Sequence, residues 1–191
     1  MSLEERFQQL TPHRQAHSQR VVSVMEALGR AHHLDLEAAR LAGWGHDLAR
    51  EWSRPALLAE ARRLGLTWGP FEEREPLLLH GPVAAMWLRE AGVGSPEVWE
   101  AIRYHTTGAP HLGKLGRALF IADGVEPGRQ YAERDELFHQ ALQDLDAGYC
   151  AVLASTLRYL EKRRLTPHPD MVAAWALCSP SGHHGETEVR N

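Results

Sequence analysis

A chain of 191 residues with a formal net charge of −4 suits one globular domain, and its charge argues against non-specific nucleic-acid binding, which needs a basic surface. No apolar run approaches the roughly 20 residues that span a bilayer, and the start of the chain lacks the basic-then-apolar layout of a signal peptide. We therefore expect a cytoplasmic protein with neither a nucleic-acid nor a membrane partner.

The two cysteines, Cys150 and Cys178, are far apart in the sequence and show no CxxC spacing. We therefore expect neither a disulfide framework nor a structural zinc site built from thiolates. Histidine is the unusual residue, because the chain contains twelve. Most of these are expected at the periphery, and only a few fall on apolar faces.

In chain order, the first predicted helix begins at Pro12 after the cap Thr11 and runs to about Arg30. Its apolar stripe, at helical spacings, consists of His17, Val21, Val24 and Leu28. A histidine therefore lies on the buried face of this helix.

The second predicted helix begins after Asp35 and ends at His46–Asp47. The small residues Ala42 and Gly43, one turn earlier, would allow other helices to come close. The side chains of His46 and Asp47, as neighbours at a helix end, point about 100° apart. A cation that lies between these two directions can be bound by both side chains.

The remaining predicted helices are separated by proline-rich or glycine-rich breaks, and residues 65–79 are predicted to be a loop. Their predicted bounds are Ser53 to Gly65, His80 to about Ala91, Ser95 to His105, Leu115 to Gly124, Ala147 to Lys162, and Asp170 to Leu177. No segment shows the period-two alternation of a strand. The fold class is predicted to be all-α, with one helical-bundle domain over residues 1–178 and a disordered polar tail over 179–191.

Six imidazole and carboxylate side chains extend the apolar stripes of their own helices. They are His17, His46, Asp47, His80, His105 and Asp123. A single buried histidine is more often a hydrogen-bonded core residue than a ligand, but burying six such groups is costly unless they pair. Because the two carboxylates would repel each other, we expect the six to satisfy one another only around a positive charge. Mixed nitrogen and oxygen ligands suit iron, manganese or zinc. Because six ligands exceed what one ion with an open position needs, we predict two divalent ions.

Four longer strings carry a resemblance to a known family. They are TPHRQAH at 11–17, LHGPVA at 79–84, AIRYHTTG at 101–108 and IADGVEPGR at 121–129. Together with His46–Asp47, they resemble the HD-domain metal phosphohydrolases. Within these, they are most similar to the YqeK-type symmetrical bis(5′-nucleosyl)-tetraphosphatases, over roughly residues 10–178.

The resemblance implies an HD-domain helical bundle that cleaves diadenosine tetraphosphate and related dinucleoside polyphosphates into two ADP. It implies two divalent ions, iron before manganese, cobalt or zinc, and a metal-bridging hydroxide as the attacking group. One ion would be held by His17, His46, Asp47 and Asp123. The second would be held by His80 and His105, with Asp47 bridging both. A homodimer is left open.

The resemblance also implies where the phosphates would be held, with two departures from the family pattern. Arg50 stands where such enzymes usually have lysine, and Gly124–Val125 replaces an aromatic-isoleucine pair. The predicted catalytic residues are His46, Asp47 and Arg50. The predicted substrate-binding residues are Arg103, Thr106, Thr107, Gly108, Lys114 and Arg129.

Three other functions fit the same residues. The first is another HD-type nucleotide phosphohydrolase, either a 5′-nucleotidase or a pyrophosphohydrolase. The second is a redox enzyme that uses two irons to activate oxygen. The third is a nucleotide-binding module without catalysis, in which the histidine cluster is occupied but idle.

Overall fold

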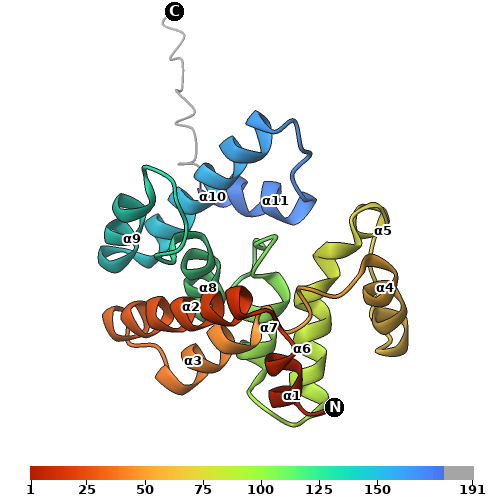
Figure 1. Cartoon of the computed structure of the whole chain (residues 1–191). Helices are drawn as coiled ribbons and strands as arrows, with labels where there is room; N and C mark the ends of the chain where they lie inside the picture. The colour runs from red at the N-terminus through yellow and green to blue at the C-terminus, as the bar shows by residue number, and fades with distance from the viewer. Residues whose placement is uncertain (179–191) are drawn as a thin grey trace, which may run out of the picture.

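The computed structural model describes residues 1–178, which form eleven α-helices and one 3-10 helix (Figure 1). No strand occurs among these residues, so the all-α prediction is confirmed. The segments of the first half are α1 (Leu3–Gln8), α2 (Pro12–Ala31), α3 (Leu36–Gly45), α4 (Arg54–Arg63), α5 (Pro70–Arg74) and η1 (Pro76–Leu79). Those of the second half are α6 (His80–Glu90), α7 (Pro96–Tyr104), α8 (Lys114–Val125), α9 (Arg134–Gln143), α10 (Leu145–Lys162) and α11 (Pro169–Cys178).

Helix α8 lies at the middle of the bundle, where α2, α7 and α10 all pack against it (Figure 1). Helix α3 packs along α2, and α6 packs along α7. The side chains of Met25, Leu88 and Leu119 are completely buried in the core between these helices. Burial of large aliphatic side chains of this kind is the main favourable contribution to the stability of such a bundle.

The predicted helix starts at the capping residues are confirmed. Thr11 accepts a hydrogen bond from the backbone N–H of Arg14, and Ser53 accepts one from Ala56. Asp35 and Ser95 cap α3 and α7 in the same way. Each cap satisfies one of the backbone donors that a helix N-terminus leaves unpaired.

The contact between α2 and α3 depends on a small residue in the second helix. A Cβ atom at Gly43 would lie 3.1 Å from the Cα atom of Val22, which is tighter than ordinary van der Waals contact with a backbone. The glycine therefore lets α3 lie directly against the backbone of α2. This close approach brings the end of α3 beside the N-terminal half of α2, where His17 lies.

The prediction of a loop over residues 65–79 is wrong in part, because α5 and η1 lie within it. Pro70 begins α5, and the Glu72 carboxylate accepts a hydrogen bond of 3.0 Å from the backbone N–H of Gly69. Segments of four and five residues are too short to show a helical period in the sequence. Helices α1 and α9 were also not predicted, since each buries only a narrow apolar stripe.

Helix α5 reaches across to the turn between α10 and α11. Nε2 of His168, in that turn, lies 3.0 Å from a carboxylate oxygen of Glu72. The ring of Phe71 lies edge-on to the same imidazole, with centroids 5.1 Å apart. These contacts join two parts of the bundle that are far apart in the sequence.

The expectation about the cysteines is wrong, because Cys150 of α10 and Cys178 of α11 form a disulfide. The two Cα atoms lie 5.4 Å apart, since α11 folds back along α10 and returns the chain to the beginning of that helix. The absence of a CxxC spacing excludes only local pairs, so it carried no information about this long-range pair.

Among the helices of residues 1–178, none has the length and apolar character that a membrane crossing requires. The predicted tail, 179–191, lies outside the described residues.

The disulfide predicts a measurable dependence of stability on oxidation. We expect Cys178→Ser to lower the free energy of unfolding by about 2–4 kcal/mol, because a cross-link restricts the unfolded chain. Urea denaturation of the wild-type protein and the variant without reductant measures this difference. With a reductant present, the two proteins should unfold at the same urea concentration. Two titratable thiols in the denatured, unreduced wild-type protein would contradict the pairing.

Candidate metal centre

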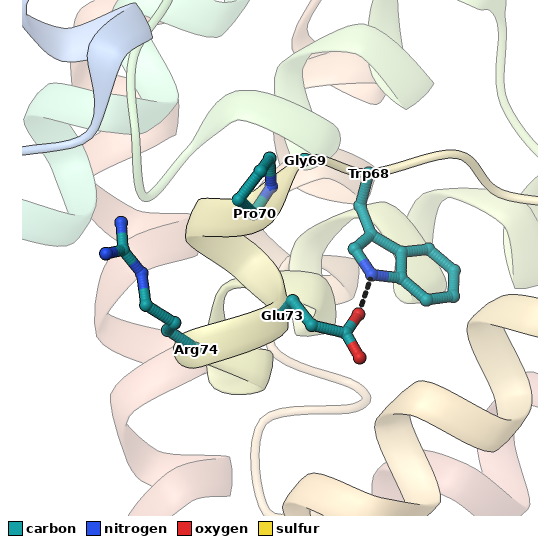
Figure 2. Close-up of a pocket in the computed structure, with 5 residues that line it drawn as sticks. All are labelled: Trp68, Gly69, Pro70, Glu73 and Arg74. Carbon is teal, nitrogen blue, oxygen red and sulfur yellow. Dashed lines mark hydrogen bonds between the residues drawn. The ribbon is translucent and has the colours of Figure 1, made fainter.

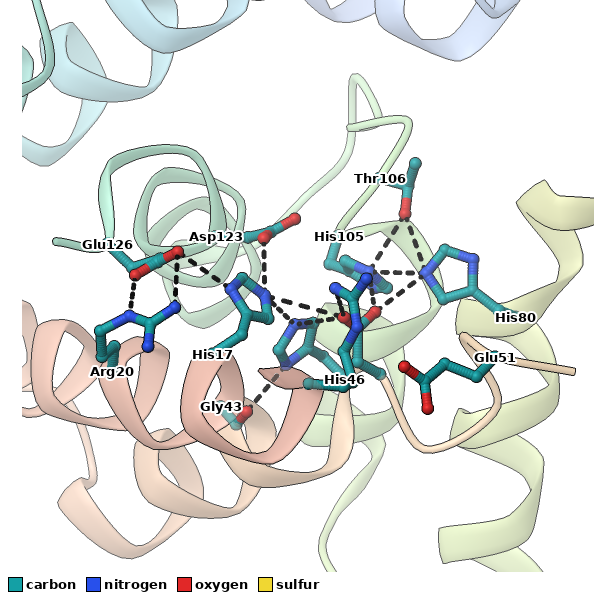
Figure 3. Close-up of polar contacts among 12 residues, drawn as sticks. His17, Arg20, Gly43, His46, Glu51, His80, His105, Thr106, Asp123 and Glu126 are labelled. Carbon is teal, nitrogen blue, oxygen red and sulfur yellow. Dashed lines mark hydrogen bonds and ion pairs between the residues drawn. The ribbon is translucent and has the colours of Figure 1, made fainter. Parts of the chain in front are cut away.

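The structure brings the six predicted ligand residues together at one place in the bundle (Figure 3). They come from five helices or their ends: α2, α3, α6, α7 and α8. The residues are His17, His46, Asp47, His80, His105 and Asp123. The histidines and Asp47 are buried, and the Asp123 carboxylate faces a cavity. Their arrangement agrees with the prediction, while their role as ligands stays a prediction.

Three of the histidines occupy helix ends, where the backbone sets the direction of the ring. The Nδ1–H group of His46 donates to the carbonyl of Gly43 at 2.8 Å, and that of His105 donates to Ile102 at 2.7 Å. His80 donates to Leu77 in the same way, at 2.5 Å. Because a carbonyl can only accept, Nδ1 carries the proton in each ring, and Nε2 is turned inward.

The inward nitrogens lie unusually close to one another. Nε2 of His80 is 3.0 Å from Nε2 of His105, and the same atoms of His17 and His46 are 3.3 Å apart. Two lone pairs at such distances repel unless a proton or a cation lies between them. Two ligand atoms that are each about 2.1 Å from one ion lie at most about 4.2 Å apart, so both pairs fit a shared ion.

Asp47 lies between the two pairs, and each of its oxygens faces one of them. Oδ1 lies 3.3 Å from Nε2 of His80 and 3.7 Å from that of His105. Oδ2 lies 3.5 Å from Nε2 of His46 and 3.7 Å from that of His17. This geometry is that of a carboxylate able to bridge two ions, as the resemblance implied.

Asp123 completes the cluster from α8. Its Oδ1 lies 3.2 Å from Nε2 of His17, and its ligand atoms also group with those of His46 and His105. Arg129 holds this carboxylate, with its guanidinium 2.5 Å from Oδ1 and 2.9 Å from the Asp123 carbonyl. Asp123 thus faces both histidine pairs rather than one alone.

Two residues that contact the cluster were not predicted. Glu126 is buried and accepts a hydrogen bond of 3.1 Å from Nδ1–H of His17, while Arg20 donates to its other oxygen at 2.5 Å. Arg14 donates to Oδ2 of Asp47 at 2.7 Å. The sequence contained a signal for both Arg14 and Glu126. Arg14 precedes His17 by three residues, about one helical turn, and Glu126 lies next to the buried Val125. A partner of this kind fixes the ring that it binds.

Burial and the neighbouring charges shift the pKa values of the cluster in opposite directions. Burial lowers the pKa of His46 to about 4 and lowers that of His80. Burial, the largest single influence, also lowers the pKa of His105, but the nearby Asp47 and Asp123 carboxylates and the Ile102 carbonyl together outweigh it and raise that pKa. Burial would raise the pKa of Asp47, yet the imidazoles around it, His46 first, hold it well below its usual range. His46, His80 and the ionised Asp47 are therefore in the forms that bind metal, whereas His105 must first lose a proton.

Of the predicted substrate-binding residues, Thr106 and Arg129 lie at the centre. The hydroxyl of Thr106 is 3.1 Å from Nε2 of His105. The Thr107 hydroxyl donates to the carbonyl of Gly108, and the Gly108 N–H donates to the carbonyl of Tyr104. These two groups are therefore engaged within the loop and are not turned toward the cluster.

Two of the other predicted cations, Arg103 and Lys114, lie away from the centre. Arg103 lines a separate cavity of about 310 Å³, because it precedes His105 by two positions and so faces another side of α7. Lys114 begins α8, and at 1.5 Å per residue it lies about 13 Å along the helix from Asp123. Arg50 follows Asp47 by one turn, and its side chain has no hydrogen bond or ion pair among residues 1–178.

A cavity of about 760 Å³ opens beside the cluster. His105, Thr106, Asp123 and Arg129 line its inner end, and α10 forms the opposite wall. A molecule in this cavity would therefore touch the cluster directly.

A second groove, over α5, has a different character (Figure 2). Its lining includes Trp68, Pro70 and Arg74, none of which belongs to the cluster. The indole N–H of Trp68 donates to Glu73 at 2.6 Å. The charged groups of the groove are one carboxylate and one guanidinium, so it does not contain a set of metal ligands.

Comparison with known proteins points to one family. The HD-domain family model matches residues 14–145. The chain is 32% identical over 168 residues to the symmetrical bis(5′-nucleosyl)-tetraphosphatase of Bacillus subtilis strain 168, covering 85% of this chain and 88% of that protein. It is also 32% identical to the protein of the same name from Halalkalibacterium halodurans, over 87% of this chain and 89% of the other.

A solved structure shows the same fold. The crystal structure of a predicted HD superfamily hydrolase involved in NAD metabolism, from Clostridium acetobutylicum, superposes with a TM-score of 0.86. The two chains are 27% identical, and the match covers 93% of this chain and 97% of the other.

The contact between Glu126 and His17 predicts an effect on metal affinity. We expect Glu126→Ala to weaken Mn²⁺ binding by about 10–100-fold, because the His17 ring loses the carboxylate that orients it. Titration calorimetry with Mn²⁺ measures this, and Glu161→Ala, an exposed acidic residue on α10, is the matched control. Equal affinities of the two variants would contradict the orienting role.

The pKa of His105 predicts that metal binding releases protons. Its raised pKa keeps a proton on the metal-free ring at pH values below that pKa, whereas a metal needs the neutral form. We therefore expect Mn²⁺ affinity to fall as the pH drops through the raised pKa of His105. His46, with a pKa of about 4, adds no such dependence above about pH 5. Calorimetry in buffers of different ionisation enthalpy measures the released protons, and an enthalpy independent of the buffer would contradict this.

Proposed function

Because this chain belongs to the HD-domain family and, within it, to the symmetrical bis(5′-nucleosyl)-tetraphosphatases, it is a hydrolase, and we propose that it cleaves diadenosine tetraphosphate at the middle of the phosphate chain. The products would be two molecules of ADP. The cluster binds divalent metal, and we propose two ions. The observation that carries the proposal is the division of the cluster by Asp47, with one carboxylate oxygen facing each pair of inward Nε2 atoms.

The residues present fit such ions. All four imidazoles and both carboxylates turn possible ligand atoms toward the centre, and no thiolate is among them. A nitrogen and oxygen donor set suits iron or manganese, and we propose iron. When bound, the ions supply Lewis acidity, which activates water at neutral pH and neutralises charge on phosphate oxygens.

The chain itself positions the substrate. Arg129 lies at the inner end of the cavity, where its guanidinium can pair with a phosphate oxygen as well as with Asp123. The hydroxyl of Thr106 borders the same space and can donate to a second oxygen. The buried histidines exclude bulk water from one side of the centre, which strengthens these charge interactions.

An assay of the purified protein with diadenosine tetraphosphate and Mn²⁺ or Fe²⁺ tests the proposal. We expect ADP as the sole nucleotide product, and hydrolysis should persist when oxygen is excluded. Chromatography of the products distinguishes this activity from a 5′-nucleotidase, which would release adenosine. Formation of ATP together with AMP would contradict the symmetrical cut.

A substitution at the bridging position tests the centre itself. We expect Asp47→Ala to remove both bound metal and measurable turnover, because the variant lacks the one group that faces both halves of the cluster. Elemental analysis and the product assay measure the two losses. Asp135→Ala, an exposed aspartate of α9, is the control. Full activity of Asp47→Ala with metal retained would contradict the bridging role.

A further inference from the structure

The cavity beside the cluster has an outer half that the reaction described above does not use. Its inner end holds His105 and Asp123, and its outer wall is one face of α10. The residues of that wall are Val152, Ser155, Thr156, Arg158, Tyr159 and Lys162. Except for Arg158, these positions recur at helical spacings of three and four, so they form one stripe that faces the cavity.

The stripe changes in character along its length. Val152 is 2% exposed, and its methyl group would lie 3.0 Å from a Cβ atom at Gly124, beside Asp123. Tyr159 is 56% exposed at the other end. At 1.5 Å per residue the stripe runs for about 15 Å from the centre outward, which is far longer than a single phosphate group needs.

The outer end of the stripe carries positive charge that the protein itself leaves largely free. The nearest carboxylate to Arg158 is that of Glu133, at 3.7 Å, and both side chains are more than half exposed. Such an exposed pair contributes little to stability. Within the part of the chain that the structure describes, Lys162 has no ion pair. Both cations can therefore pair with an anion in the cavity.

The aromatic residue Tyr159 lies between Arg158 and Lys162 along α10 and lines the same cavity. The Arg163 guanidinium is 5.6 Å from the centre of the Tyr159 ring, and the ring also lines the cavity. Tyr131 lines the cavity from the opposite side, where its hydroxyl donates to the Gly124 carbonyl at 2.9 Å. Exposed aromatic rings beside cations are the usual surface on which a nucleotide base stacks.

We propose that this face of α10 holds one nucleoside diphosphate half of the substrate, with Arg158 and Lys162 paired to its phosphates and Tyr159 against its base. The inference rests on the proposed function. A tetraphosphate chain is cut at its middle only if one end is held at a set distance from the reacting bond. The stripe on α10 begins beside Asp123 and ends in two cations and an aromatic ring. It can therefore bind one end of the substrate at a set distance from the reacting bond.

The test compares variants of the metal-loaded enzyme. We expect Arg158→Gln and Lys162→Gln each to raise the KM for diadenosine tetraphosphate and the inhibition constant of ADP by about tenfold, the factor for one lost charge-assisted hydrogen bond. The metal content and the kcat should change little, because these residues do not touch the reacting atoms. Tyr159→Leu should weaken inhibition by ADP but leave inhibition by inorganic pyrophosphate unchanged.

The matched control is Arg164→Gln, which removes the same charge two residues beyond Lys162 but does not line the cavity. If the wild-type enzyme cleaves symmetrically while the α10 variants behave like this control, the inference is wrong and the proposed function stands. If the wild-type enzyme does not produce ADP, the proposed function fails first. If Tyr159→Leu weakens inhibition by pyrophosphate as strongly as inhibition by ADP, the placement of the base is wrong.

Discussion

The centre depends on a local constraint that repeats at three helix ends. His46, His80 and His105 each donate their Nδ1–H to the carbonyl three residues earlier, which turns Nε2 inward. The backbone therefore orients these rings before any ion binds. A ligand set that is already oriented requires little reorganisation on binding, which is the condition for both tight binding and catalysis. The remaining parts of the fold serve to bring these helix ends to one place.

Helix packing converts separate helix ends into one cluster. Gly43 lets α3 lie directly against α2, so that Nε2 of His46 comes within 3.3 Å of that of His17. Packing of α6 on α7 brings His80 and His105 together in the same way. Asp47 then lies between the pairs, since it follows His46 immediately at the end of α3. A larger residue at Gly43 would push α3 away from α2 and so separate His46 from His17, even with every ligand residue present.

Much of this could be predicted from the sequence, and what was missed has physical reasons. Periodicity and capping predicted the long helices, and the apolar stripes identified the residues that converge. Segments with little period, such as α5 and α9, were missed. Distance along the chain says nothing about the pairing of Cys150 with Cys178, which depends on how α11 folds back. Arg103 was expected at the centre, but its position on α7 turns it toward another cavity.

The sequence argument for metal relied on repulsion between carboxylates, and the structure shows that this argument is incomplete. Arg14 pairs with Asp47, and Arg129 pairs with Asp123. Each carboxylate therefore already has a guanidinium, and their mutual repulsion does not require an ion. The inward nitrogens are different, because no arginine among residues 1–178 donates a hydrogen bond to any of them, and they lie in two close pairs. The Thr106 hydroxyl has one proton, which can satisfy one lone pair but not four. The need for positive charge at the centre thus comes from the imidazoles. In the metal-free protein a proton on His105, whose pKa is raised, meets part of it, and a bound metal ion would replace that proton.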